Sequence, residues 1–283
     1  MPCLPREPFA STSVQGSAWI DSATPARRIA LAYALPGAVV LALGLALWRH
    51  GPIAQWAGYH DFADQRPWLG IAHAADVLSN LGFAFVGAAG LWRLCSAWGA
   101  PALRSGREGW ALFFAAVLGT RAGSAWYHLA PDNARLVWDR LPIALACAGL
   151  LAAVWRETIG ASRWVTPALA AGAVASVAWW RGTDLAGAGD LRPYVMLQVL
   201  PLLLVPLLQW QHEAPARERR AVAVAMVLYL LAKAAEWADV PLFAALGFCS
   251  GHTLKHVLAT VAAALRAQGL FGRLAAARIN GDR

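Results

Sequence analysis

Eight apolar stretches, each of about 18 to 23 residues, alternate along the chain with short segments rich in arginine, glycine and proline. A run of about 20 apolar residues is long enough to cross a bilayer as an α-helix. The chain is 59% hydrophobic and 14% charged, whereas soluble domains average about 25% charged residues. The pattern therefore predicts an all-α integral membrane protein whose helices cross the membrane over residues 29–48, 70–92, 109–129, 136–155, 164–181, 193–211, 221–239 and 252–270.

The charges between the apolar stretches set the expected orientation. Fourteen arginines fall on the side that holds both ends of the chain, and five fall on the other side. Positive residues are retained on the cytoplasmic side of a membrane, so both termini are expected in the cytoplasm. The net charge of +8 therefore indicates topology rather than nucleic-acid binding. The four cysteines are scattered without a CxxC pair, which is typical of packing residues.

Polar residues inside the apolar stretches gather in one half of the expected membrane. Ionisable side chains are costly in hydrocarbon, so by default they mark function. The residues are His73 and Asp76 in the second stretch, Arg121, Ser124 and His128 in the third, Asp139 and Arg140 in the fourth, Lys233, Glu236 and Asp239 in the seventh, and His252 and His256 in the eighth. Their common depth predicts a buried polar site in the extracytoplasmic half.

Two histidines, His252 and His256, stand one helical turn apart at the start of the last apolar stretch. Imidazoles at this spacing share one helix face and can bind one metal ion. Such a pair is also common at a membrane interface without any metal. His128 supplies a third imidazole, and three protein ligands plus a water make a catalytic zinc site. The alternative for His128 is a histidine that caps the end of its helix.

Asp139 and Ser124 are the candidate catalytic residues beside such a zinc ion. The Asp139 carboxylate lies in an apolar context, where it can deprotonate a zinc-bound water and pass the proton to the leaving nitrogen. Ser124, one turn before His128, can donate a hydrogen bond to that water or to a developing oxyanion. The structural alternatives are an ion pair of Asp139 with Arg140 or Arg135, and a bond from Ser124 to a carbonyl of its own helix.

Further polar residues are candidates for supporting roles. The Lys233–Glu236 pair favours a structural role, because pairing lowers the cost of both charges in a membrane. Residues that could orient the metal ligands are Asp76, Ser79, Asn80, Lys233, Glu236 and Asp239. Asp61 and Asp64 are candidate calcium ligands, although we favour solvated carboxylates at both positions.

In combination, these motifs resemble the alkaline ceramidases, a family of seven-span zinc-dependent membrane amidases. Their wider superfamily includes the adiponectin-receptor-like proteins. The resemblance rests on GSAWYHLAPDN and LVWDRLP, followed far downstream by SGHTLKH, and it covers residues 55–270. It implies a seven-helix transmembrane bundle over that range, with residues 29–48 as one additional N-terminal transmembrane helix. Residues 1–28 and 271–283 are then an N-terminal tail and a cytoplasmic tail.

The resemblance also implies site residues and a reaction. The implied zinc ligands are His128, His252 and His256, and the residues that contact the catalytic water are Asp139 and Ser124. The implied reaction hydrolyses the amide of ceramide or a related N-acyl lipid to a sphingoid base or amine and a fatty acid. Animal members also bind calcium, and Asp61 and Asp64 fit acidic positions of that site. Arg66 and His73 stand where further oxygen ligands would be expected.

Two other classes of function stay open at this point. One is a non-enzymatic or weakly hydrolytic seven-span protein that binds lipid, as in the receptor-like relatives. The other is a haem-binding electron carrier, which would need axial histidines that face each other across helices at matched depth.

Overall fold

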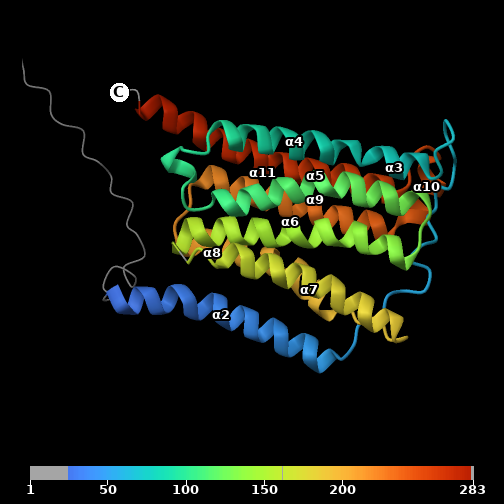
Figure 1. Cartoon of the computed structure of the whole chain (residues 1–283), viewed down its shortest axis with the longest axis horizontal. Coiled ribbons are helices and arrows are strands. Elements are labelled where there is room, and N and C mark those ends of the chain that lie inside the picture. Colours follow the sequence, from blue (N-terminus) through green and yellow to red (C-terminus); the bar gives the residue numbers. More distant parts are fainter. Residues whose placement is uncertain (1–24, 161, 282–283) are drawn as a thin grey trace, which may run out of the picture.

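The computed structural model describes residues 25–160 and 162–281, and every regular element in this part of the chain is helical apart from one isolated β-bridge. The long helices are α2 (Pro25–His50), α4 (Leu81–Ser96), α5 (Arg107–Leu129), α6 (Asn133–Ile159), α7 (Val165–Leu185), α8 (Arg192–Gln211), α9 (Ala216–Trp237) and α11 (Gly251–Gly281). The short ones are α3 (Ala74–Ser79), the 3-10 helix η1 (Pro101–Leu103) and α10 (Asp239–Leu246). The long helices lie side by side in an elongated bundle (Figure 1). The all-α class predicted from the sequence is confirmed.

The predicted apolar stretches coincide with these helices, usually to within a few residues, but two ends differ. The stretch predicted over 221–239 is broken, because α9 ends at Trp237 and α10 follows at an angle of 84°. Pro241 cannot donate to the Trp237 carbonyl and its ring crowds that group, which ends the helix. The last helix continues to Gly281, since FGRLAAARING is rich in good helix formers. Of the tail predicted over 1–28, residues 1–24 lie outside the described residues, and α2 already begins at Pro25.

Several helices are long and apolar enough to cross a membrane. Among the described residues these are Ala32–His50, Ala74–Ser96, Asn133–Ile159 and Arg192–Gln211, and the bent pair α9–α10 makes a fifth if it forms one span. In α5 and α11, apolar sequence is interrupted by the polar side chains of the candidate site. The bundle is therefore compatible with an integral membrane protein.

Small residues let the central helices approach closely. Helix α5 packs against α4 and α6, and α11 packs against α4 and α9. A Cβ added to Gly109 of α5 would lie 2.3 Å from the backbone nitrogen of Ala153 in α6, so no larger residue fits there. Close packing of this kind is how helices associate in a membrane.

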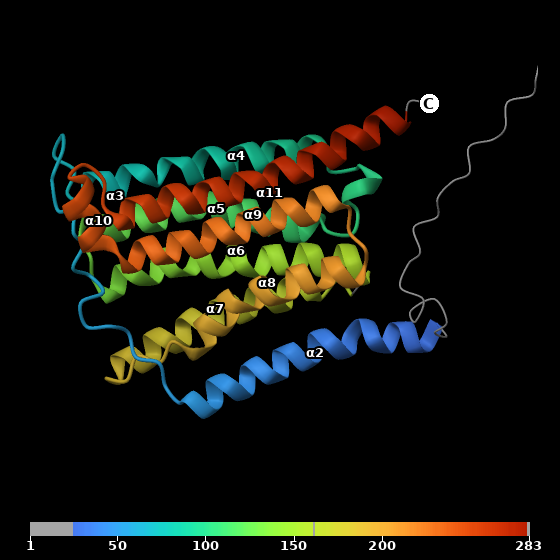
Figure 2. The same cartoon turned by 180° about the vertical axis from the view of Figure 1, so that it is seen from behind.

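Helix α2 lies on the outside of the bundle. It packs against α8 (Figure 2), with Val39, Val40 and Leu43 against the cluster around Leu204. Only a small share of its surface is buried, and Leu41 is 63% exposed. The remaining helices form a compact group without it (Figure 1).

Candidate metal centre

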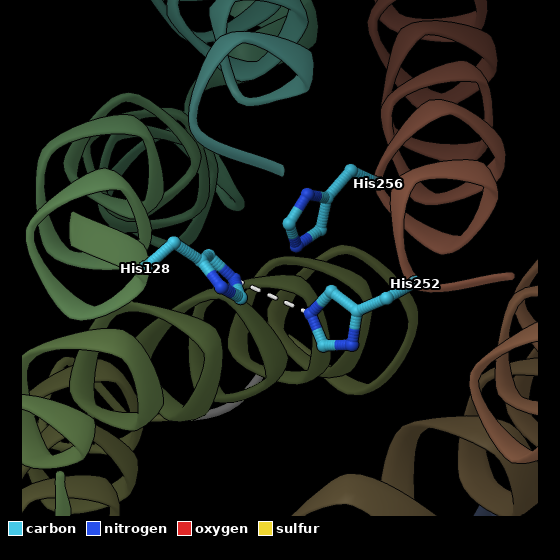
Figure 3. A group of neighbouring side chains, drawn as sticks. All are labelled: His128, His252 and His256. Carbon is cyan, nitrogen blue, oxygen red and sulfur yellow. Dashed lines mark hydrogen bonds between the residues drawn. The ribbon is translucent and has the colours of Figure 1, made fainter. Parts of the chain in front are cut away.

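Three buried histidines converge at one end of the bundle. His128 comes from the last turn of α5, and His252 and His256 come from the start of α11 (Figure 3). The Nε2 atoms of His128 and His252 are 3.2 Å apart, and one ring nitrogen of each histidine lies within 4.8 Å of the others. Two nitrogens bound at about 2.05 Å to a tetrahedral ion would be about 3.3 Å apart. The cluster can therefore hold a metal ion, and three imidazoles are a donor set that suits zinc.

The start of α11 is fixed by a glycine and an aspartate. A Cβ on Gly251 would lie 2.1 Å from the carbonyl oxygen of Ala235, so only glycine allows α11 to begin against α9. The Asp239 carboxylate accepts hydrogen bonds from the backbone nitrogens of His252 at 2.7 Å and Ala63 at 2.9 Å. Asp239 thereby holds the first ligand turn of α11 and the loop before α3 in place.

Ser79 orients His256. Its hydroxyl donates to the carbonyl of Asp76 at 3.0 Å, and its oxygen lies 2.8 Å from Nδ1 of His256. A hydroxyl has only one proton, so Nδ1 of His256 must be the donor in the second bond. The lone pair of Nε2 is then free for a metal, the usual arrangement for a metal-binding histidine.

Asp76 and Asn80 are buried next to this contact rather than at the imidazoles. Thr253 donates to Oδ1 of Asp76 at 2.6 Å, and the Asn80 amide donates to the Asp76 backbone carbonyl at 2.7 Å. The first bond joins α3 to the first turn of α11, and the second lies within α3 and its C-cap. Asp76 therefore supports the position of α11, and Asn80 supports the end of α3.

Lys255 is a site residue that the sequence patterns did not single out. Its Nζ lies 2.8 Å from Nε2 of His252 and 2.9 Å from Oε1 of Glu236. Glu236 also pairs with Lys233, as the sequence predicts. The signal was present in SGHTLKH, where Lys255 stands one turn after His252.

A cavity of about 260 Å³ reaches this end of the bundle. Ser124, Asp139 and His256 all line it. Ser124 lies close to the Asp139 carboxyl group, but its Oγ makes no hydrogen bond of good geometry within the described protein. Most other lining residues are apolar. The cavity thus joins an apolar space to the Asp139 carboxyl group, the Ser124 hydroxyl, one imidazole and the charged side chains of Lys233, Glu236 and Lys255.

The arginines near Asp139 have other partners. Arg135 pairs with Asp132 at 2.9 Å, and the Arg140 guanidinium lies 3.9 Å from the ring centroid of Trp180. No ion pair joins Asp139 to either arginine in the part of the chain that the structure describes. The structure therefore does not support the alternative interpretation, in which Asp139 forms an ion pair with Arg135 or Arg140.

The loop before α3 covers the histidines. The ring of Phe62 lies against His128 and His252, with centroid distances of 4.7 and 4.4 Å. In the same loop, Arg66 binds both oxygens of the buried Asp64 carboxylate, and these bonds lower the pKa of Asp64 below its usual value.

The two calcium candidates are not placed together as ligands. Arg66 occupies the carboxylate of Asp64, and Asp61 is exposed to solvent. Neither belongs to a group of three possible ligands among the described residues, where the gathered group is the histidine cluster. The prediction of a solvated carboxylate is therefore wrong for Asp64, which is buried and paired with Arg66, whereas Asp61 is exposed as predicted.

Comparison with protein-family models, with curated proteins and with solved structures gives no match to this chain. Function is therefore inferred from the side chains, the cavity and the fold.

Proposed function

We propose that this protein is a zinc-dependent membrane amidase that hydrolyses ceramide or a related N-acyl lipid to an amine and a fatty acid. One observation carries the proposal: three buried histidines converge, and one of them, His256, lines an apolar cavity together with Asp139 and Ser124. The resemblance of these motifs to the alkaline ceramidases supports the same reaction.

The protein groups divide the chemistry of amide hydrolysis between them. A zinc ion on three histidines supplies Lewis-acid activation of water and of the amide carbonyl at neutral pH. Asp139 takes a proton from the attacking water and delivers it to the nitrogen as the C–N bond breaks. Ser124 Oγ donates a hydrogen bond to the carbonyl oxygen as negative charge develops there. The products are a carboxylic acid and an amine.

The cavity wall supports a lipid substrate. Beyond the polar end it is built from side chains such as Ile143, Leu150, Leu202, Val205 and Met226. Sites for organic ligands are mostly apolar, with a few polar groups that fix orientation. Alkyl chains suit such a wall, and the amide would lie at the end that holds Asp139.

The decisive test is Asp139→Asn in the purified full-length chain, assayed for fatty acid release from a panel of N-acyl lipids. Loss of a general acid–base group typically lowers the rate by about 10²- to 10⁴-fold, so we expect at least a 100-fold fall in kcat with zinc content unchanged. Asp132→Asn is the matched control, because asparagine also caps helices and Asp132 caps α6 away from the cavity.

Two results would contradict the amidase. One is undiminished turnover in Asp139→Asn. The other is a zinc-loaded wild type that binds these lipids but turns none of them over, which would favour the receptor-like alternative.

A further inference from the structure

The cavity contains a charged side chain that the proposed reaction does not use. Arg266 of α11 lines the same cavity as Asp139 and His256 and is only 6% exposed. Its Nε and Nη1 are buried and have no hydrogen-bond partner. The guanidinium carbon lies 5.6 Å from the ring centroid of Trp110. A buried guanidinium without an anion is costly, so this arrangement calls for a partner.

The neighbouring acidic residues are engaged elsewhere. Arg273, about two turns further along α11, pairs with Glu157 at 2.9 Å and with Glu218 at 3.5 Å. Glu157 also accepts a hydrogen bond from the Trp110 indole at 2.6 Å. No ion pair links Arg266 to either carboxylate within residues 25–160 and 162–281. The open donors of Arg266 are therefore left for a group inside the cavity.

Arg266 and the metal centre lie at opposite ends of an apolar path. Ten residues of α11 separate His256 from Arg266, which corresponds to about 15 Å at 1.5 Å per residue. Between them, α11 contributes Ala259, Ala262 and Ala263 to the cavity wall. A helical side chain leans towards the helix N-terminus, which directs Arg266 along the cavity towards the histidines.

We propose that Arg266 binds a carboxylate at the end of an alkyl chain whose other polar group lies at the histidine cluster. An arginine can hold a carboxylate through two parallel charge-assisted hydrogen bonds, the strongest kind available to it. That the polar group at the histidine cluster is an amide rests on the proposed function. This inference narrows the proposed substrates to N-acyl lipids whose acyl chain ends in a carboxylate. The anion site itself requires only the cavity and Arg266.

The test compares dodecanedioate with dodecanoate, measured by calorimetry on the full-length zinc-loaded protein in detergent. Both acids can place one carboxylate at the metal centre, so this contact contributes equally to both affinities and cancels when they are compared. We expect the wild type to bind the diacid at least about tenfold more tightly, and Arg266→Met to lose this preference. Arg266→Lys should keep part of it, because it retains the positive charge. The control Arg163→Met, which changes an exposed arginine outside the cavity, should keep it in full.

A wild type without preference for the diacid, or a preference that survives Arg266→Met, would overturn the inference. Binding is measured without turnover, so the two proposals fail separately. A protein without hydrolytic activity whose preference for the diacid depends on Arg266 would contradict only the proposed amidase function. A protein that hydrolyses N-acyl lipids but does not prefer the diacid would contradict only the proposed anion site at Arg266.

Discussion

The Lys255 ammonium group lies on the side of His252 that faces the other imidazoles. It contacts Nε2 of His252, the same atom that lies 3.2 Å from His128. A cation in this position competes with a metal ion for the lone pair and repels it electrostatically. Glu236 bonds to Lys255 and offsets part of this repulsion. We therefore expect Lys255 to lower the affinity of the cluster for a metal ion rather than to act as a ligand.

Replacing Lys255 by methionine should strengthen zinc binding by about tenfold, which is about 1.4 kcal/mol, since both the competing hydrogen bond and the charge are removed. Competition with a chromogenic chelator measures the Kd. Lys233→Met is the matched control, because Lys233 pairs with the same Glu236 but is about half exposed. Weaker zinc binding in Lys255→Met would show that the lysine helps to build the centre.

Residue types and spacing were enough to predict which histidines meet. His252 and His256 share a helix face by their spacing, and His128 joins them because the ends of α5 and α11 lie together. Lys255 and Phe62 were not predicted. Their roles depend on contacts between a side chain and a distant segment, and neither hydropathy nor spacing records such contacts.

Helices α5 and α6 meet closely next to the candidate catalytic residues. A Cβ on Gly123 would lie 1.9 Å from the carbonyl oxygen of Trp138. Gly123 precedes Ser124, and Trp138 precedes Asp139, so this contact sets the spacing between the two catalytic candidates. The glycine is required by the approach of two backbones.

Gly123→Ala should destabilise the bundle by about 1–3 kcal/mol, the usual cost of overpacking, and should lower turnover by moving Ser124 away from Asp139. Gly119→Ala is the control on the same helix, because the added Cβ would meet only Pro142 at 3.6 Å. Thermal unfolding in detergent and the hydrolysis assay give both readouts. Equal behaviour of the two variants would contradict the role of this contact.

Helix positions follow from the hydrophobic pattern more closely than their ends do. An apolar run fixes where a helix must lie, and each predicted stretch contains an observed helix, although the stretch over 70–92 becomes helical only from Ala74 and is divided between α3 and α4. The sharp bend between α9 and α10 and the extension of α11 to Gly281 were missed. The first depends on Pro241, and the second on helix propensity in a segment that is not continuously apolar.

The bundle has two distinct ends. The start of α2 and the end of α11 lie at one end, and α3, α10 and the loop before α3 lie at the other (Figures 1 and 2). Exposed tryptophans occur near both, with Trp92 and Trp164 close to the first and Trp68 and Trp237 close to the second. Tryptophans at this placement match the two interfacial belts of a membrane protein. We propose that all eight long helices cross the membrane, as seven core spans and an additional first span.

From the excess of arginine at the first end, we expect that end to lie in the cytoplasm and the histidine cluster to lie on the extracytoplasmic side. In intact cells, a membrane-impermeant maleimide should label Trp68→Cys, while the native Cys95, exposed near the end of α4, should react only after permeabilisation. Each position is tested with the remaining cysteines replaced by alanine. Labelling of Cys95 alone in intact cells would reverse the proposed orientation.

The metal content of the purified full-length chain tests the metal centre most directly. Mass spectrometry of the wild type should find about one zinc ion per chain. The ion should be lost in His252→Ala and His256→Ala, because two imidazoles hold a metal much less tightly than three, and hydrolysis should be lost with it. A wild type that hydrolyses N-acyl lipids without bound metal would contradict this account, as would zinc that persists when both histidines are replaced.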